Sequence, residues 1–222
     1  MKTIVVIPAY NEAKTIGAVL DAVRPFVDRI VVVDDGGMDA TADIARASGA
    51  MIYRHVVNRG LGASLGTGIA AALRGGADII VTMDGDGQHR AEDIPSLVAP
   101  IAERRADVVL GVRTRDRAHM PITRRVANIC ANILTWILFG VWTSDSQSGF
   151  RAFARHAAEQ LDIKGDRMEV SSEILSETKR LGLRFAEVPI APIYTAYSLS
   201  KGQGFREGLR TIERLFIRRF FR

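Results

Sequence analysis

The chain has 222 residues, enough for one α/β domain with a buried core and too few for two full-sized domains. Hydrophobic residues make up 47% and charged residues 25%, which excludes a disordered chain. The net charge of +5 favours anionic partners such as nucleotides, phosphates or acidic lipids, and the single cysteine excludes an internal disulfide.

Apolar β-branched runs alternate with helix-like stretches over the first half of the chain. The expected strands are Thr3–Ile7, Ile30–Val33, Met51–Val56, Ile79–Met83 and Val108–Val112. The expected helices between them are Thr15–Val23, Ala40–Ser48, Ser64–Arg74 and Ile94–Arg104. This alternation predicts an α/β fold with a mainly parallel sheet covered on both faces. Ligands bind at the carboxyl ends of such strands, so we expect the polar loops there to share one edge.

The alternation stops after Gly111. There follow a basic loop, a long apolar helix, a polar loop at Ser144–Arg151, a helix around Val170–Leu181, a strand near Phe185–Ile190 and a basic tail. The uncharged segment Val126–Ser144 approaches the length of a membrane-spanning helix. However, Asn128, Asn132 and Thr135 recur at helical spacing, which favours an amphipathic or interfacial helix instead.

The last residues predict a basic amphipathic helix over residues 205–222, following a domain at residues 1–204. Its apolar stripe consists of Phe205, Leu209, Ile212, Phe216 and Phe220, with arginines around it. Such a helix is typical of contact with an anionic bilayer, although packing on the domain core with a solvated basic face is the alternative. The chain begins directly with a strand and no signal peptide is recognisable. We therefore expect a cytoplasmic domain associated peripherally with the cytosolic membrane face.

A turn rich in aspartate and glycine follows the fourth strand, with the sequence Asp84-Gly85-Asp86-Gly87-Gln88-His89. Asp84 and Asp86 are one residue apart and can both reach a single hard cation such as Mg²⁺ or Mn²⁺. The ion would offset the charge on a leaving diphosphate. A solvated Asp-Gly turn without a metal is the alternative.

Three further loops carry candidate nucleotide-binding groups. Asp34-Asp35 end the second strand, where an aspartate can accept hydrogen bonds from a ribose or a base, or cap the next helix. Pro8-Ala9-Tyr10-Asn11-Glu12 offers an aromatic ring and a carboxylate to a base. Asn58-Arg59-Gly60-Leu61-Gly62 can bring backbone N–H groups close to a phosphate or sugar. This loop follows the third strand, so its likeness to a dinucleotide-binding fingerprint is weak.

Six motifs together carry a family resemblance: PAYNE, VDDGGMDAT, NRGLGAS, DGDGQH, GVR and DSQSGFRAF. Their order and spacing are similar to those of inverting family 2 glycosyltransferases, and most resemble the polyprenyl-phosphate (dolichol-phosphate) mannose and glucose synthase branch. The likeness runs from Ile4 to about Lys201. It implies a GT-A fold, a Rossmann-like three-layer arrangement, and transfer of a hexose from GDP-mannose, UDP-glucose or UDP-N-acetylglucosamine to a lipid phosphate.

The resemblance also implies roles for individual residues. The nucleotide-sugar donor would contact Pro8, Ala9, Tyr10, Glu12, Asp35, Arg59, Gly62, Asp84 and Gly85. The metal would be held by Asp84, Asp86 and Gln88, and the acceptor phosphate by Arg113, Arg124, Arg151 and Lys201. The residues expected to take part in catalysis are Asp86, Asp145 and Arg113. Glu173 matches a recurrent glutamate of the branch.

The sequence departs from the branch in two places. Gly36-Gly37 replace the usual serine after the paired aspartates, and Thr195 stands where the mannose synthases carry an arginine. Lys201 or Arg206 are the candidate replacements for that arginine. Mannose is therefore not singled out as the sugar.

A phosphate acceptor fits the many arginines between Arg113 and Arg151, because arginine forks match phosphate oxygens and a phosphate needs no general base. The main alternative is a family 2 enzyme with a sugar-hydroxyl acceptor, which would need Asp145 or Glu173 as a base. More distant alternatives are an NAD-dependent oxidoreductase and a non-catalytic nucleotide-binding module. We expect no nucleic-acid partner, because basic and aromatic residues do not interleave on a sheet face. A homo-oligomer stays open.

Overall fold

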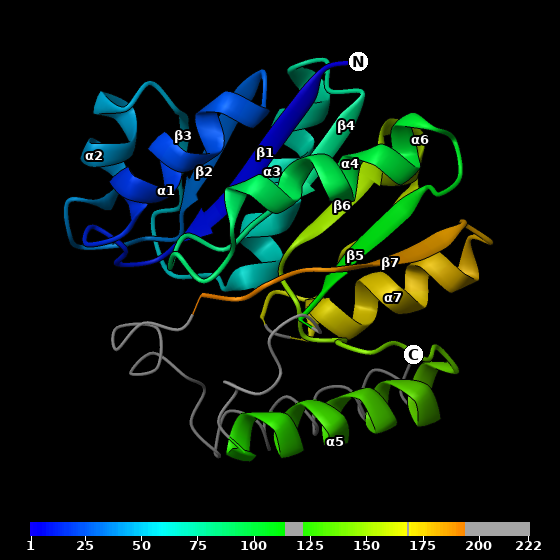
Figure 1. Ribbon diagram of the computed structural model, residues 1–222. Helices are drawn as coiled ribbons and strands as arrows, with labels where there is room; N and C mark the ends of the chain where they lie inside the picture. Colours follow the sequence, from blue (N-terminus) through cyan, green and yellow to red (C-terminus); the bar gives the residue numbers. More distant parts are fainter. Residues whose placement is uncertain (114–121, 168, 194–222) are drawn as a thin grey trace.

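The computed structural model describes residues 1–113, 122–167 and 169–193 (Figure 1). The strands are β1 Thr3–Ala9, β2 Arg29–Asp34, β3 Met51–Arg54, β4 Ile79–Thr82, β5 Val108–Val112, β6 Arg151–Ala154 and β7 Phe185–Pro189. The helices are α1 Ile16–Val23, α2 Thr41–Ala47, α3 Leu61–Arg74, α4 Ile94–Ala102, α5 Ile122–Phe139, α6 Arg155–Gln160 and α7 Val170–Arg180. Two short 3₁₀ helices, η1 Arg24–Phe26 and η2 Ala91–Asp93, complete the described part.

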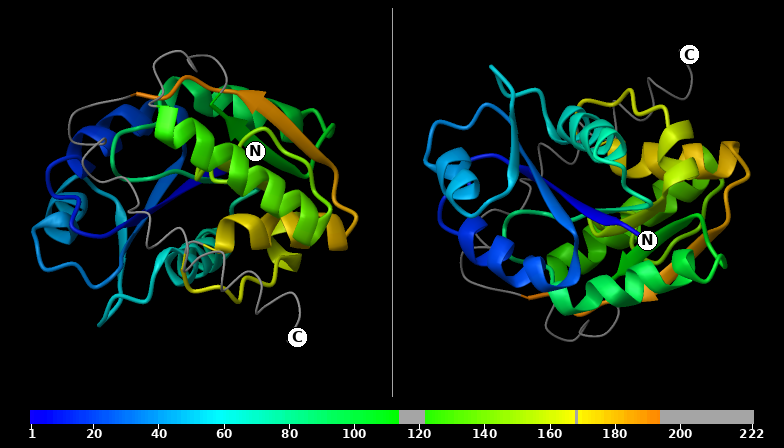
Figure 2. Two further views of the ribbon diagram at one scale, coloured as in Figure 1. Left: turned by 90° about the horizontal axis from the view of Figure 1, so that it is seen from below. Right: turned by 90° about the horizontal axis from the view of Figure 1, so that it is seen from above.

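The strands form one seven-stranded sheet in the order β3-β2-β1-β4-β6-β5-β7, and β6 alone runs antiparallel to its neighbours. Helices lie on both sides of this sheet (Figure 2), which confirms the predicted α/β architecture. In the register of β6, Arg151 pairs with Thr82 on one side and with Leu110 on the other. The start of β6 therefore meets the carboxyl ends of β4 and β5 at one edge of the sheet.

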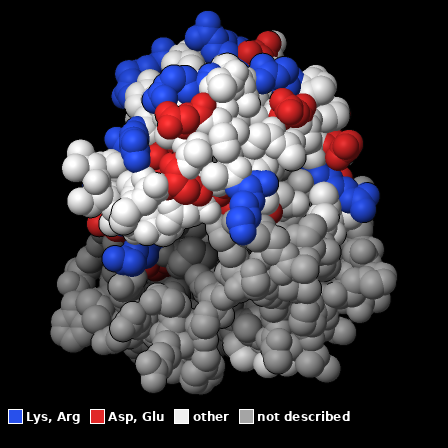
Figure 3. All heavy atoms as spheres, turned by 90° about the vertical axis from the view of Figure 1, so that its left-hand side faces the viewer, with Lys and Arg blue, Asp and Glu red and all other residues white. Residues whose placement is uncertain are grey.

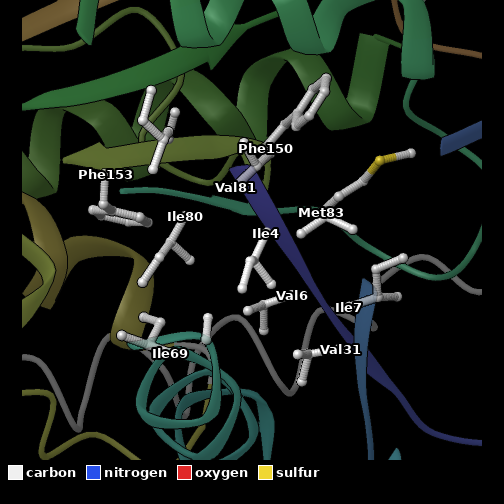
Figure 4. Close-up of a cluster of buried hydrophobic side chains, with 14 of the residues drawn as sticks. Ile4, Val6, Ile7, Val31, Ile69, Ile80, Val81, Met83, Phe150 and Phe153 are labelled. Carbon is white, nitrogen blue, oxygen red and sulfur yellow. The ribbon is translucent and has the colours of Figure 1, made fainter. Parts of the chain in front are cut away.

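The hydrophobic core is built mainly from the central strands (Figure 4). Ile4, Val6 and Ile80 are fully buried, as are Phe150 and Phe153 from the antiparallel segment. β1 and β4 read as unbroken apolar runs because both of their faces are covered by helices. This rigid centre fixes the positions of the polar loops that follow each strand.

Several boundaries differ from those predicted. The sequence pattern did not reveal β6 or α6, because β6 is only four residues long and half alanine. The long helix is α5, and it begins at Ile122 and ends at Phe139 instead of reaching Ser144. Gly140 terminates it with φ +64°, a left-handed conformation that favours glycine. The predicted domain boundary at residue 204 and the helix at 205–222 lie outside the described residues.

Within the described part of the chain, no helix combines the length and the hydropathy that a membrane crossing requires.

Candidate functional site

The acidic turn after β4, which contains Asp84 and Asp86, packs against the loop that precedes β6. The carboxylate of Asp84 is 38% exposed, and its Oδ2 lies 3.1 Å from Nε2 of the buried His89, whose ring packs on Phe150 with 5.0 Å between centroids. Thr82 Oγ1 donates to the carbonyl of Gly149 at 2.8 Å. A Cβ on Gly149 would lie 2.5 Å from Asp84 Oδ1. Only glycine therefore lets this loop approach the carboxylate so closely.

The two carboxylates of the turn have pKa values displaced in opposite directions. Burial, together with the negative charge of Asp84, raises the pKa of Asp86. Burial also acts to raise the pKa of Asp84, but the hydrogen bond with His89 and the charges of His89, Arg151 and Arg113 lower it overall. The pair thus concentrates negative charge that the surrounding cations only partly offset.

The donor set of this turn fits a divalent cation, because carboxylate oxygens are the ligands that Mg²⁺ and Mn²⁺ prefer. Asp84 and Asp86 are close enough to repel one another, and a cation between them would relieve that repulsion. Gln88 turns its amide nitrogen towards Asp86 Oδ2, so its role as a ligand through the amide oxygen stays a prediction. No group of three or more His, Cys, Asp or Glu side chains among the described residues has metal-binding geometry. Protein ligation would thus come chiefly from the two aspartates.

A bidentate ion pair lies beside the acidic turn. Arg113, which follows β5, donates from Nε to Asp145 Oδ2 at 2.6 Å and from Nη2 to Asp145 Oδ1 at 2.7 Å. The backbone N–H of Arg113 also donates to Oδ2 at 3.2 Å. Asp145 is only 1% exposed, whereas the Arg113 side chain is 22% exposed. Asp145, a candidate catalytic residue and base, is thus held in this geometry as the ion-pair partner of Arg113.

Arg151, the first residue of β6, is a fully buried cation beneath the site. Burial lowers its pKa to about 10, although the charges of Asp84 and Asp145 act to raise it. Its Nη2 lies 3.5 Å from the carbonyl of Ser146, and its Nε has no hydrogen-bond partner among the residues that the structure describes. The predicted direct contact with an acceptor phosphate is not available in this geometry, because the side chain is 1% exposed. Arg151 instead stabilises the carboxylates of Asp84 and Asp145 through its charge.

Asp35, predicted to hold a nucleoside, is already the centre of a hydrogen-bond network. Its Oδ1 lies 2.7 Å from His55 Nδ1 and accepts from Arg59 N at 3.0 Å, and its Oδ2 accepts from Gly60 N at 2.7 Å. His55 Nε2 in turn lies 3.0 Å from Thr67 Oγ1 on α3. Asp35 thus shapes the loop between β3 and α3. The sequence pattern gave no reason to single out His55, since a lone histidine after a strand has no motif.

The loop after β1 lies against the acidic turn. Thr15 Oγ1 donates to Glu12 Oε2 at 3.1 Å and to the carbonyl of Gly85 at 2.8 Å. Pro8 and Ala9 end β1, and Tyr10 is 46% exposed beside the buried Glu12. The predicted nucleoside-binding residues Pro8 to Glu12 therefore do share one edge with the predicted metal ligands.

The glycine-rich loop has a structural partner. Gly62 N donates to the carbonyl of Asp166 at 2.8 Å, and a Cβ on Gly62 would lie 1.6 Å from the carbonyl oxygen of Gly165. Glu173 on α7 holds this partner segment, accepting from Lys164 N at 3.2 Å and from Gly165 N at 2.7 Å. The glycines thus admit a neighbouring chain segment, and the N–H of Gly62 is taken by the carbonyl of Asp166. Contact of this loop with the donor stays a prediction.

Other predicted acceptor residues lie outside the description. Arg124 belongs to the first turn of α5, whose side chains are not described, and Lys201 lies beyond residue 193. On the face shown in Figure 3, lysine and arginine side chains are interspersed with aspartates and glutamates. The net positive charge of the chain therefore does not form a single patch among the coloured residues of that face.

Comparison with known proteins gives the site a context. The sequence model described as Glycosyl transferase family 2 matches residues 4–162. The uncharacterized protein MJ1222 of Methanocaldococcus jannaschii is 43% identical over 223 residues, covering 98% of this chain and 92% of the relative. The UDP-N-acetylglucosamine–dolichyl-phosphate N-acetylglucosaminyltransferase of Methanococcus voltae is 34% identical, covering 96% and 94%.

A solved structure has the same fold. It is glucosyl-3-phosphoglycerate synthase from Mycobacterium tuberculosis in complex with Mn²⁺, uridine diphosphate and phosphoglyceric acid. It superposes with a TM-score of 0.77 at 25% identity, covering 98% of this chain and 78% of that chain.

Proposed function

The chain belongs to glycosyl transferase family 2 and is a glycosyltransferase with a GT-A fold, and from this premise we propose the reaction that it catalyses. It transfers a hexose from a nucleotide-sugar, with Mg²⁺ or Mn²⁺, to the phosphate of a polyprenyl or dolichyl lipid at the cytosolic face of a membrane. The configuration at the anomeric carbon is inverted.

The observation that carries this proposal is the pairing of Asp145 with Arg113. A sugar-hydroxyl acceptor must lose a proton during transfer and needs a carboxylate base. Both oxygens of Asp145 instead accept hydrogen bonds from the Arg113 guanidinium at 2.6 and 2.7 Å. The Asp145 carboxylate is thus paired with the Arg113 cation, which makes it a weaker proton acceptor.

Glu173, the other candidate base, is also engaged. Its two carboxylate oxygens accept from the backbone N–H groups of Lys164 and Gly165. A phosphate monoester has a second pKa of about 6 and is already largely dianionic near neutral pH. Such a nucleophile needs charge neutralisation and alignment more than proton removal, and the partly exposed Arg113 supplies a cation for it.

The donor would bind on the side of the acidic turn that faces the loops after β1 and β2, away from Arg113. The ring of Tyr10 would stack on the base, and Glu12 would accept from its edge, while Asp35 shapes the adjoining loop. Asp84 and Asp86 would hold the divalent ion, which when bound offsets charge on the leaving diphosphate. Because the Methanococcus voltae relative is named for UDP-N-acetylglucosamine, this donor is the first to test.

The proposal is tested by incubating the protein with a polyprenyl phosphate, Mg²⁺ or Mn²⁺, and separately UDP-N-acetylglucosamine, GDP-mannose or UDP-glucose. The product is a glycolipid detected by mass, and it should form from one donor. Asp86→Ala should reduce the rate by about a thousandfold or more, because it removes a metal ligand. If no donor yields a glycolipid while the nucleotide-sugar is still consumed, the proposed acceptor is wrong.

A further inference from the structure

Helix α5 presents apolar side chains at the surface, whereas two of its polar side chains face the protein. Asn132 is 7% and Thr135 0% exposed. Leu138 is buried as well, but from residue 126 to 137 every exposed position that the structure describes is apolar or cysteine. These outward residues, which we name the α5 outer face, are Val126, Ile129, Cys130, Ile133, Trp136 and Ile137.

The inward polar contacts show that this orientation is specified by the sequence. Asn132 Nδ2 donates to the carbonyl of Ser144 at 2.9 Å, and its Oδ1 accepts from Ser146 N at 2.8 Å. Thr135 Oγ1 lies 3.0 Å from Ser172 Oγ on α7. Rotating the helix to bury its apolar face would break these bonds and leave buried polar groups without partners. The outward direction of the apolar face is thus fixed.

The region around the C-terminal end of α5 contains groups typical of a bilayer interface. Trp136 and Trp142 are 52% and 66% exposed and pack edge to face with 6.3 Å between ring centroids. Lys179 on α7 donates to the carbonyl of Gly140 at 2.8 Å, which brings an ammonium group to the same end. Indole rings favour the boundary between headgroups and hydrocarbon, and a nearby cation complements anionic headgroups.

The α5 outer face is also tied to the site described above. Asn132 bonds to the residues on both sides of Asp145, and Asp145 holds Arg113. A surface resting on this face would therefore lie at a fixed position relative to Arg113. Figure 1 shows α5 at the border of the molecule, away from the sheet.

We propose that the α5 outer face, with Trp142, is the surface by which the catalytic domain rests on a lipid bilayer, and that Asn132 transmits this position to Arg113. The choice of a bilayer over a second copy of the chain rests on the proposed function, because a lipid phosphate is presented at the bilayer surface. α5 then lies in the interface plane with its polar side towards the protein.

Intrinsic fluorescence reports on this surface directly, because Trp136 and Trp142 are the only two tryptophans of the chain. Adding vesicles of phosphatidylcholine and phosphatidylglycerol should shift their emission to shorter wavelength, and brominated lipid should quench it. A nitroxide on Cys130, the only cysteine, should become shielded from a water-soluble relaxation agent. No donor or acceptor is needed, so this result is independent of catalysis.

A matched pair of variants tests the face itself. Ile137→Glu places a charge on the α5 outer face, and Val56→Glu places the same charge at a 99% exposed apolar residue elsewhere. Ile137→Glu should weaken vesicle binding by about tenfold or more, from the lost burial of one isoleucine, and Val56→Glu should change it by less than about twofold. Both positions are exposed, so melting temperatures should match the wild type.

Three results would overturn the inference. The first is equal vesicle binding by the two variants, and the second is vesicle binding without a change in tryptophan emission. The third is a dimer whose formation, without lipid, shifts the emission and is abolished by Ile137→Glu, since a second copy would then cover the face. Vesicle binding through α5 without glycolipid synthesis would leave this inference standing and refute the proposed function.

Discussion

Two carboxylates from the two halves of the sheet are held in different ways. Asp35, after β2, is paired with His55 and with the backbone N–H groups of Arg59 and Gly60. Asp145, beyond β5, is paired with the guanidinium of Arg113. The first half is a regular α/β unit, whereas the second contains an inserted antiparallel strand and a helix with its apolar face outward.

Under the proposed function, the first half of the sheet would bind the nucleoside and the second half would carry the transfer step. A preformed loop network suits a nucleoside, which is recognised by shape and a few hydrogen bonds. Concentrated buried charges suit a reaction in which a diphosphate leaves and a phosphate attacks. The acidic turn of Asp84 and Asp86 lies where the halves meet. Changes at this junction should therefore have the largest effects, and changes far from it the smallest.

Gly149→Ala should have the largest effect among the variants considered next. Its Cβ would lie 2.5 Å from Asp84 Oδ1 and displace the carboxylate. We expect a loss of transfer rate of about a hundredfold, the usual consequence of a 1 Å misplacement in a reacting site. The matched control is Gly66→Ala in α3, where a Cβ would meet nothing within 4 Å. Gly66→Ala should keep full activity and gain about 0.5–1 kcal/mol of stability, and comparable loss in both variants would contradict this account.

Asp145→Asn comes next and separates the roles of anchor and base. Replacing the carboxylate weakens its charge-assisted bonds to Arg113, so kcat/KM should fall by about tenfold to a hundredfold. If Asp145 acts through Arg113, the double variant with Arg113→Gln should lose little more than either single variant. A kcat abolished by Asp145→Asn but nearly unchanged by Arg113→Gln would make Asp145 a base and favour a hydroxyl acceptor.

Glu173→Ala should affect donor binding more than turnover. It frees the segment containing Gly165, which packs on the glycines at the start of α3. We expect the KM for the nucleotide-sugar to rise by about tenfold with a smaller change in kcat, because one positioning contact is lost. Glu177→Ala, one turn along α7, removes a pair with the exposed Arg180 and should change KM by less than about twofold. A pure loss of kcat at Glu173 would point to a chemical role.

The smallest effect is expected at Asp107, which precedes β5 and so lies at the amino end of that strand, away from the acidic turn. Hydrogen bonds from Arg184 lower the pKa of Asp107 from 3.8 to about 2, despite its burial. The resulting stability is fully present above the ordinary aspartate pKa and is lost as the pH falls from about 4 towards 2. Because Arg184 is exposed, we expect Asp107→Asn to reduce the free energy of unfolding at pH 7 by only about 1 kcal/mol.

Denaturant unfolding of Asp107→Asn should also show a weaker loss of stability between pH 4 and 2, with unchanged activity at saturating substrate. An acid transition identical to that of the wild type would mean that Asp107 does not carry this dependence.

The sequence predicted the first half of the fold well, because β1 to β5 alternate with helices and their apolar runs are long enough to recognise. It placed the acidic turn and the Pro8–Glu12 loop on one edge for the same reason. It could not show that Asp145 holds Arg113, since the two residues are 32 positions apart and only the fold joins them. Nor could it show why Gly62 is glycine, because the cause is the approach of Gly165 from a distant segment.

The sequence predicts the polar stripe of α5, but it does not show whether this stripe faces the protein or the solvent. A helix with Asn132 and Thr135 on one face would usually turn that face to water, and here both are buried. The partners that reverse the direction, Ser144, Ser146 and Ser172, carry no signal of their own in the sequence.

The most direct test of the central claim compares two acceptors that differ only in the phosphate. The purified protein, with its preferred nucleotide-sugar and Mn²⁺ or Mg²⁺, is given a polyprenyl phosphate or the polyprenol of the same chain length, and the glycolipid is measured by mass. The account predicts product from the phosphate alone, because Arg113 gives the site a cation and both candidate bases among the described residues, Asp145 and Glu173, are engaged in hydrogen bonds. Comparable product from the polyprenol would contradict it.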